Sequence, residues 1–599
     1  MRRDGAGWWT ERNALVLIML AALVAVLPLA VHGCSCGHDF DFHLGSWMEA
    51  ASQFRHGNLH PHWAFSPAFN AGEPRFVFYP PLSWTIGAVL GLLLTHLPGI
   101  SRAAGWNAVP IVYTWIALSL SGVMLYRLSR RYASEGSAAI AAVFYAVNPY
   151  MLFTAYERTA YAELLAAAWM PLLLGAILQE EVTITGIALP VALLWLTNAP
   201  AAVMGCYALA FLALFRVVAV KRNGDRDQRV SPLLLAARIF SGTALGLALA
   251  GFYLVPAVCE RRLVQVSMAM IDEMRIDHNF LFEHTGTSSD AVLHDQVLHT
   301  VSTIAVFLLC AALVCLAILR YKRHEQSTTD EPAKFPFAAF TGMITGIAFL
   351  LTPISNAVWQ HAPEARFLQF PWRLLAVLAP ACAVLIARCI HSLISTGNGW
   401  PLQIGMRPHW TLWGAAAISV AAALVLPEFR TFQQGCDVAE TVTARLATFE
   451  SHTGSNPTDE YTPMTADNDA LKPDNPPYWL STTADGNAAQ AGRVSRPGVV
   501  PQHFVVQSPA AEFLILNLRE YPSWRILLDG RLDATRAQRY DGLIAIPVPA
   551  GASTVDVHYA TSVEQWAGDA ISLVACTLVS LLILRRRGHR TRHPLPVSS

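Results

Sequence analysis

Two aspartates and two histidines stand close together in a short loop near the N-terminus of this 599-residue chain. The segment Gly37-His38-Asp39-Phe40-Asp41-Phe42-His43 directly follows a long apolar stretch. A carboxylate at a membrane surface can accept a proton from a hydroxyl, while a histidine, an arginine or a divalent cation balances a leaving phosphate. The pattern predicts catalytic roles for Asp39 and Asp41 and a substrate-binding role for His43, with a solvated structural loop as the alternative.

The same loop offers ligands for a metal. A hard divalent cation could bind the carboxylates of Asp39 and Asp41, and it is the only cofactor that the residues suggest. Cys34 and Cys36 precede the loop, but their spacing from the histidines matches no closed zinc site. We expect a structural Cys34–Cys36 pair, or free thiols, in preference to a metal site.

Further ionisable residues occur in two other segments expected on the same side of a membrane. Arg158 and Glu163 lie in one of them, and Arg366 and Arg373 lie in the other. Charged groups at membrane depth are costly, and arginines bind phosphate oxygens in bidentate fashion. We expect these four residues to bind the substrate and its phosphate. Interfacial anchoring by long side chains is the alternative for each of them.

The composition indicates that lipid surrounds much of the chain. Hydrophobic residues make up 54% of it and charged residues 14%, whereas soluble domains carry charges at about a quarter of their positions. The formal net charge is +0, which argues against a nucleic-acid-binding polycation. The fold class expected is a mainly α polytopic membrane protein.

About twelve apolar stretches are long enough to be read as transmembrane helices. They lie near 14–32, 106–126, 136–154, 162–178, 183–198, 200–220, 233–256, 298–319, 336–355, 373–393, 410–427 and 566–584. Basic clusters such as Arg127–Arg131 and Arg320–Arg323 alternate with non-basic loops, which predicts that both termini are cytoplasmic. This alternation requires Pro81–Leu97 to be a juxtamembrane or re-entrant helix. The first stretch could instead be a signal peptide.

Two large polar pieces are expected outside the membrane. The first is the outer loop 33–80, within a membrane domain that covers 1–427. The second is an extracytoplasmic domain, 428–565, whose short apolar runs and Asp-Gly turns predict a β-sandwich. Residues 566–599 would form the last transmembrane helix and a basic cytoplasmic tail.

Several short segments carry a family resemblance. They include Asp39-Phe40-Asp41-Phe42-His43-Leu44, Gly72-Glu73-Pro74-Arg75, Arg158-Thr159-Ala160-Tyr161-Ala162-Glu163, Gln369-Phe370-Pro371-Trp372-Arg373 and Tyr521-Pro522-Ser523-Trp524-Arg525. The chain resembles bacterial multi-spanning membrane proteins labelled as related to 6-pyruvoyl-tetrahydropterin synthase. More distantly, it is similar to GT-C glycosyltransferases and YfhO-like membrane proteins. Pterin chemistry is set aside, because the sequence shows no soluble zinc-histidine pterin domain.

The GT-C resemblance implies a function for the first outer loop. An acidic residue there serves as base or metal ligand in GT-C enzymes, the donor is a sugar on a polyprenyl phosphate, and Asp39 and Asp41 match that position. We therefore expect transfer of a sugar to a glycan or lipid acceptor at the outer face of a bacterial cytoplasmic membrane. The alternatives are a transporter or flippase of lipid-linked glycan and a non-catalytic envelope assembly protein.

Overall fold

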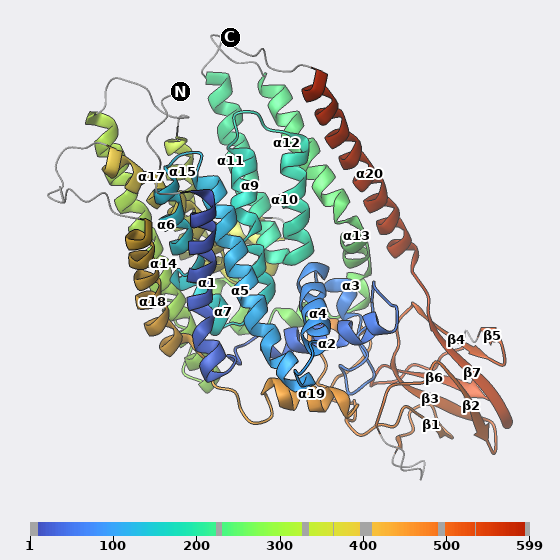
Figure 1. Ribbon diagram of the computed structural model, residues 1–599. Coiled ribbons are helices and arrows are strands. Elements are labelled where there is room, and N and C mark those ends of the chain that lie inside the picture. Colours follow the sequence, from blue (N-terminus) through green and yellow to red (C-terminus); the bar gives the residue numbers. More distant parts are fainter. Residues whose placement is uncertain are drawn as a thin grey trace.

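The computed structural model describes residues 10–222, 231–325, 335–362, 364–395, 410–488, 497–532 and 535–592. A body of long helices carries a smaller β region at one end (Figure 1). The helix α1 begins, and α20 ends, at the opposite end of this body. The chain is therefore a mostly helical protein with candidate membrane spans and a C-terminal β region.

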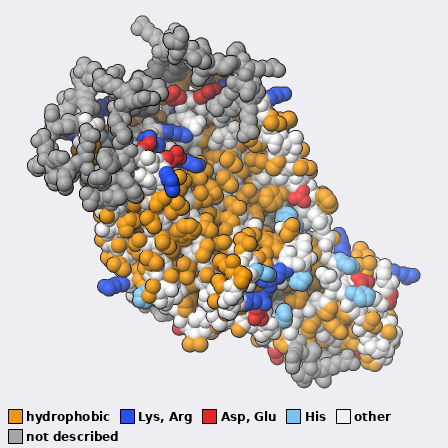
Figure 2. Space-filling model, viewed as in Figure 1, with side chains coloured by type: hydrophobic (Ala, Val, Ile, Leu, Met, Phe, Trp, Pro, Cys, Tyr) orange, Lys and Arg blue, Asp and Glu red, His pale blue; other side chains and the backbone are white. Residues whose placement is uncertain are grey.

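Nine helices or helix pairs in the described ranges are long and apolar enough to cross a membrane. They are α1 (Glu11–His32), α5 (Arg102–Ser129), α6 (Glu135–Ala146) with α7 (Pro149–Tyr156), α11 (Ala199–Arg222), α12 (Pro232–Leu249), α14 (Ser289–Glu325), η7 (Pro371–Leu374) with α17 (Leu375–Ser395), α18 (Trp410–Phe432) and α20 (Val563–Arg592). Figure 2 shows mainly hydrophobic side chains over the middle of the helical body, with charged ones toward its ends. This distribution suits a lipid-embedded protein.

Three stretches expected to cross the membrane are not single long helices. The first is divided into α8 (Tyr161–Ala166) and α9 (Trp169–Ile177), the second is α10 (Ile184–Thr197), and the third is α15 (Phe337–Leu350) followed by η5 (Pro353–Ser355) and α16 (Asn356–His361). The last pair bends by 92°, directly before a proline, which disfavours helical backbone in the residue preceding it. The described residues thus hold nine candidate spans, or ten with the bent pair, instead of about twelve.

The first helix is an integral part of the bundle. It packs against α5, α6 and α18, and its Met19 carbonyl accepts a hydrogen bond of 3.2 Å from the Trp115 indole. The helix α4 (Pro81–Thr95), expected not to cross the membrane, has 15 residues and packs on α2 (Phe40–Arg55) and α5. At about 1.5 Å per residue, α4 is shorter than the roughly 30 Å of a hydrocarbon core.

Short elements connect the long helices around the end that carries the β region. They are α3 (Arg75–Phe78), α13 (Gly251–Glu260), η1 (Arg261–Leu263), η2 (Val266–Ala269), η3 (Asp272–Met274), η4 (Ile276–His278), η6 (Ala365–Leu368), α19 (Val442–Glu450) and η8 (Asp459–Tyr461). Segments far apart in the sequence meet here, because α19 contacts both α2 and α5.

The β region consists of two antiparallel sheets. One has the order β1-β3-β6 and the other β2-β7-β4-β5. The strands are β1 (Tyr478–Ser481), β2 (His503–Ser508), β3 (Glu512–Arg519), β4 (Trp524–Leu528), β5 (Arg531–Leu532), β6 (Leu543–Val548) and β7 (Gly551–Tyr559). Side chains from both sheets form one apolar cluster that includes Leu514, Ile526 and Val555.

The segment 33–80 packs against the other face of the three-stranded sheet. Successive side chains of a strand point to opposite faces, so Ile515 of β3 and its partner Ala545 of β6 face away from the cluster between the sheets. They pack instead with Ala68 and Ala71 of the first loop. The two polar pieces predicted from the sequence therefore form one contiguous structure.

Candidate functional site

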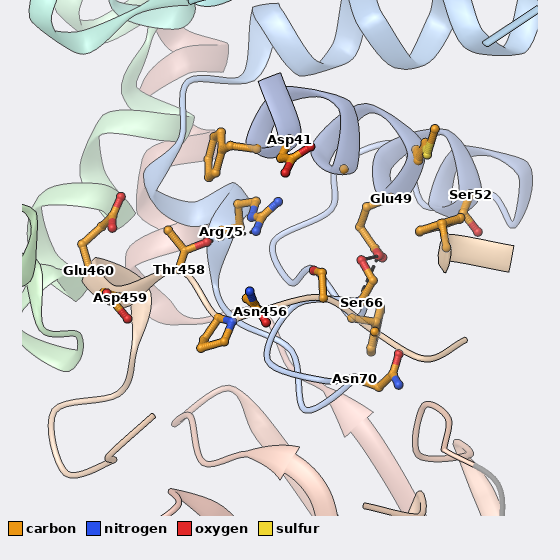
Figure 3. A pocket seen from close by; sticks show the side chains of 18 of the residues that line it. Asp41, Glu49, Ser52, Ser66, Asn70, Arg75, Asn456, Thr458, Asp459 and Glu460 are labelled. Atoms are coloured by element: carbon orange, nitrogen blue, oxygen red, sulfur yellow. Dashed lines mark hydrogen bonds between the residues drawn. The ribbon is translucent and has the colours of Figure 1, made fainter. Parts of the chain in front are cut away.

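A cavity of about 1240 Å³ lies between α2, the loop that follows it and the segment that precedes the strands (Figure 3). Typical small-molecule pockets measure about 300–1,000 Å³, so this cavity can hold a larger ligand. One face of α2 lines it along the helix, through Asp41, Gly45, Glu49, Ser52 and His56. These positions are three or four residues apart, as expected for a single helix face.

Asp39 stands at the N-terminal end of α2 and lines the cavity. Its backbone N–H donates a hydrogen bond of 2.9 Å to the carbonyl of Arg158, which fixes it beside the short connection between α7 and α8. Its half-buried carboxylate makes no hydrogen bond or ion pair with the residues that the structure describes. Asp39 is therefore free to accept a proton or to contact a ligand.

Asp41 lies two residues further along, in the first turn of α2, and has a partner. Its carboxylate accepts a hydrogen bond from the guanidinium of Arg445 on α19, and the two side chains are 46% and 33% exposed. Burial raises the pKa of Asp41, while the nearby Arg445 charge opposes that shift. The two aspartates thus differ in that only Asp41 has an ion-pair partner among the described residues.

Two arginines share one buried glutamate next to Asp39. Arg158 Nη1 lies 2.7 Å from Glu163 Oε2, and Arg373 Nε lies 3.8 Å from the same oxygen. Tyr150 donates a hydrogen bond to the other oxygen of Glu163. Arg158 and Arg373 line the cavity, whereas Glu163 lies behind them. Glu163 balances one of the two positive charges, and the nearby Asp39 carboxylate acts electrostatically on both arginines. Guanidinium N–H groups that Glu163 does not engage can bind an anion.

Aromatic rings hold both guanidinium groups in place. The Arg158 guanidinium carbon lies 5.0 Å from the ring centroid of Trp372, and that of Arg373 lies 4.8 Å from the centroid of Phe370. Arg373 also donates a hydrogen bond of 2.9 Å to the Leu368 carbonyl. Such contacts fix the orientation of a planar guanidinium, so its remaining N–H groups are preorganised for a ligand.

His43, also expected at the site, is placed away from the cavity. His43 is buried among the rings of Trp47, Tyr79 and Tyr161 and does not line the cavity. Burial lowers the pKa of His43 to about 4, so it is a neutral packing residue near pH 7. Arg366 lies in η6, and its side chain falls outside the part of the chain that the structure describes.

Arg75 is a cavity residue to which the sequence motif assigned no role. It lies 2.8 Å from Glu73 and donates hydrogen bonds of 3.1 Å to Ser46 and 3.0 Å to Thr458. Glu73 belongs to the loop after α2, Ser46 to α2 itself, and Thr458 to the segment that precedes the strands. Arg75 therefore crosslinks the walls of the cavity, and only its place in the Gly72-Glu73-Pro74-Arg75 motif could have indicated it.

A disulfide joins the segment before α2 to the segment before α19, near Asp39 in the sequence. It links Cys36 to Cys436, 400 residues apart, and the expected Cys34–Cys36 pair does not form. Residues separated by a single position cannot easily reach disulfide geometry. Cys34 is a free thiol that lies 3.7 Å from the Asn107 carbonyl oxygen.

The cavity has an apolar wall beside the arginines. Met268, Ile271 and Met274, from the segment between α13 and α14, line it together with Phe370. Met268 and Ile271 are 40% and 49% exposed. An apolar wall beside a cationic pair suits a ligand with an anionic head and a hydrocarbon chain.

The residues around Asp39 do not fit a cation held by protein ligands alone. Asp41 is engaged by Arg445, and no group of three His, Cys, Asp or Glu side chains within the described ranges is arranged to hold a metal ion. A divalent cation at this place would need oxygen ligands from a substrate.

Comparisons with known proteins give weak likenesses. No protein-family model and no curated protein matches the chain. The arabinofuranosyltransferase AftD from Mycobacteria is similar at 17% identity over 72% of this chain and 27% of that chain, with a TM-score of 0.40. The oligosaccharyltransferase of Archaeoglobus fulgidus in its apo form matches at 15% identity over 77% and 62%, with a TM-score of 0.40.

A further solved structure is the archaeal oligosaccharyltransferase AglB in complex with an inhibitory peptide and a dolichol-phosphate. It matches at 17% identity over 76% of this chain and 57% of that chain, with a TM-score of 0.39. The chain spans less than two thirds of the length of each of these proteins. Likenesses at this level carry no functional argument, so the function has to be argued from the cavity.

Proposed function

We propose that this chain is a GT-C-like glycosyltransferase, which moves a sugar from a polyprenyl-phosphate donor to an acceptor hydroxyl at the outer face of a bacterial cytoplasmic membrane. One observation carries the proposal. The Asp39 carboxylate, which forms no ion pair within the described part of the chain, lies near Arg158 and Arg373, and these two arginines share Glu163. A base and an anion site are thus adjacent in one cavity.

The reaction follows from this arrangement. The acceptor oxygen attacks the anomeric carbon of the sugar, while the bond from that carbon to the phosphate oxygen breaks in line. The acceptor proton passes to the Asp39 carboxylate, which acts as general base. The polyprenyl phosphate leaves as an anion, and Arg158 and Arg373 stabilise the charge that develops on it. No step needs a group that the cavity and the two substrates do not supply.

The donor's lipid chain would lie along the apolar wall. Met268 and Ile271 are exposed and line the same cavity as Arg373. Gln369, which accepts a hydrogen bond from Arg373, donates one of 2.7 Å to the carbonyl of Ala269 in the same segment. A polyprenyl chain held there keeps its phosphate at the arginines. The disulfide between Cys36 and Cys436 fits an oxidising compartment, which supports placing this end of the molecule outside the cytoplasm.

A transporter of lipid-linked glycan is the weaker alternative. Transporters place their ionisable groups near the middle of the bilayer, at the interface of structural repeats. Here α2 and α19, which line the cavity, lie at the end of the helical body beside the β region (Figure 1). This position favours chemistry at a membrane surface.

The proposal is tested by assaying sugar transfer with the purified chain in lipid nanodiscs. Radiolabelled polyprenyl-phosphate sugars are supplied with envelope glycans from the producing cells, and product formation is compared with that of Asp39→Asn. Transfer by the wild type and its loss in the variant are expected. Equal activity of the two proteins contradicts the proposal. Unchanged envelope glycans in cells carrying Asp39→Asn, with glycan loss on deleting 428–565, favour a non-catalytic assembly role.

A further inference from the structure

We infer that the elongated part of the cavity binds the acceptor, and that this acceptor is an extended, neutral glycan chain whose reacting end lies at Asp39. The inference rests on the proposed function and adds the acceptor class. The cavity is longer than a single sugar or a lipid headgroup requires, because either of these would occupy only the part of the cavity next to Asp39.

The cavity follows α2 over nearly its whole length. Lining residues run from Asp39 at one end of the helix to His56 at the other. At about 1.5 Å per residue, this path is roughly 25 Å long. In Figure 3, Asp41 and Ser52 lie at separate positions along the helix, and Ser66, Asn70 and Asn456 lie across from it. The shape is that of a groove open to a chain-like ligand.

Near Ser52 the groove carries few unpaired charges, because Asp459 and Glu460, which also line the cavity, lie on the opposite side of the view in Figure 3. Glu49 already accepts hydrogen bonds of 3.0 Å from Gln53 and 2.8 Å from Ser66. The Ser52 hydroxyl and the Asn456 amide line the groove and make no hydrogen bonds with the described side chains or backbone. Neutral donors and acceptors of this kind suit the hydroxyl groups of sugars.

Other acceptor classes fit this part of the cavity less well. A hydrocarbon chain would bury these amides and hydroxyls without hydrogen bonds, at a cost of about 1–3 kcal/mol each. An extended peptide needs a free backbone edge, but Ser455 pairs with the first loop through two hydrogen bonds of 2.9 Å, to Ser66 and Phe69. Phe65 and Phe449 line the groove and offer apolar surfaces for the C–H faces of sugar rings.

The experiment measures binding, without donor, of neutral oligosaccharides of graded length, prepared by partial hydrolysis of envelope glycans from the producing cells. The full-length protein in nanodiscs is compared with Ser52→Trp, which fills the groove away from Asp39. The matched control is Leu59→Trp, because Leu59 is 74% exposed and does not line the cavity. Peptides of graded length are measured in parallel.

We expect Kd to fall with chain length, and Ser52→Trp to weaken binding of the longest chains about tenfold while Leu59→Trp binds like the wild type. A Kd independent of chain length, no binding, or preferential binding of the peptides overturns the inference. Length-dependent binding without any sugar transfer supports the groove but overturns the proposed function. Sugar transfer to acceptors that bind with equal affinity at every length supports the proposed function but overturns the groove as an acceptor site.

Discussion

Arg445 of α19 is ion-paired with Asp41 of α2, although 404 residues separate them in the chain. The pair leaves Asp39 as the aspartate of the first loop without a charged partner among the described residues. Both members of the pair are partly exposed, where ion pairs contribute at most about 1 kcal/mol, so its importance lies in the chemistry of Asp41.

The two aspartates should therefore respond differently to substitution. Asp39→Asn removes the general base, which typically contributes about 10²–10⁴-fold, so we expect a loss of that size in kcat for sugar transfer. Asp41→Asn removes only the partner of Arg445 and should lower kcat by a few-fold. Transfer by each purified variant in nanodiscs is the measurement. Equal losses in the two variants would show that Asp41 shares the role of Asp39.

Replacing an arginine of the site by lysine keeps its charge but removes the planar fork that binds phosphate. Arg373→Lys should raise KM for the polyprenyl-phosphate donor about tenfold, because one bidentate contact is lost. The control is Arg102→Lys, since Arg102 forms an exposed pair with Glu450 outside the cavity. A donor KM that is the same in both variants would exclude Arg373 from phosphate binding.

Burial makes His43 a source of acid sensitivity. Its pKa is lowered to about 4, mainly by burial; Asp39 acts in the opposite sense, and Arg158 and Arg75 lower it further. An unfolded histidine has a pKa of about 6.5, so the unfolded state binds more protons between these values. The free energy of unfolding should fall by about 3 kcal/mol as pH drops from about 6.5 to 4, and this contribution is constant above pH 6.5.

The variant His43→Phe isolates this effect from other titrating groups. It keeps an aromatic ring against Trp47 and Tyr79 but cannot take up a proton. Thermal unfolding of wild type and variant across this pH range should show a smaller loss of stability in the variant. Parallel pH profiles of the two proteins would mean that His43 is accessible and charged.

The disulfide between Cys36 and Cys436 should stabilise the cavity walls. Cys436→Ser is expected to lower the free energy of unfolding by about 2–4 kcal/mol, a typical contribution of a disulfide that closes a long loop. Cys259→Ser is the control, because Cys259 is an exposed free thiol. Tm is measured for both, with and without reductant. A wild-type Tm that reductant leaves unchanged would contradict this role.

The sequence predicted the features that depend on local pattern. The long apolar helices and the β-rich C-terminal part follow from hydrophobic periodicity and turn residues. Arg158, Glu163 and Arg373, singled out as costly charges near a membrane, meet in one cluster. Local pattern also explains why too many spans were predicted. The stretch that bends before Pro353 is as apolar as an unbroken span, so its sequence does not reveal the break.

The pairings between distant segments could not be predicted in this way. Nothing near Cys36 indicates a partner 400 residues away, and nothing near Asp41 indicates Arg445. The groove along α2 exists only because the segment 452–460, which precedes the strands, folds back over the loop that follows α2. Its neutral residues, such as Ser52 and Asn456, belong to types that are common on any polar surface.

In the proposed reaction, the donor phosphate binds at Arg158 and Arg373 beside Asp39. The most direct test is an experimental structure of the protein in nanodiscs with a non-hydrolysable polyprenyl-phosphate sugar analogue. The account predicts the phosphate within hydrogen-bond distance of Arg158 and Arg373, the anomeric carbon facing Asp39, and the lipid along Met268 and Ile271. A phosphate bound elsewhere, with Arg158 and Arg373 still paired only to Glu163, would contradict it.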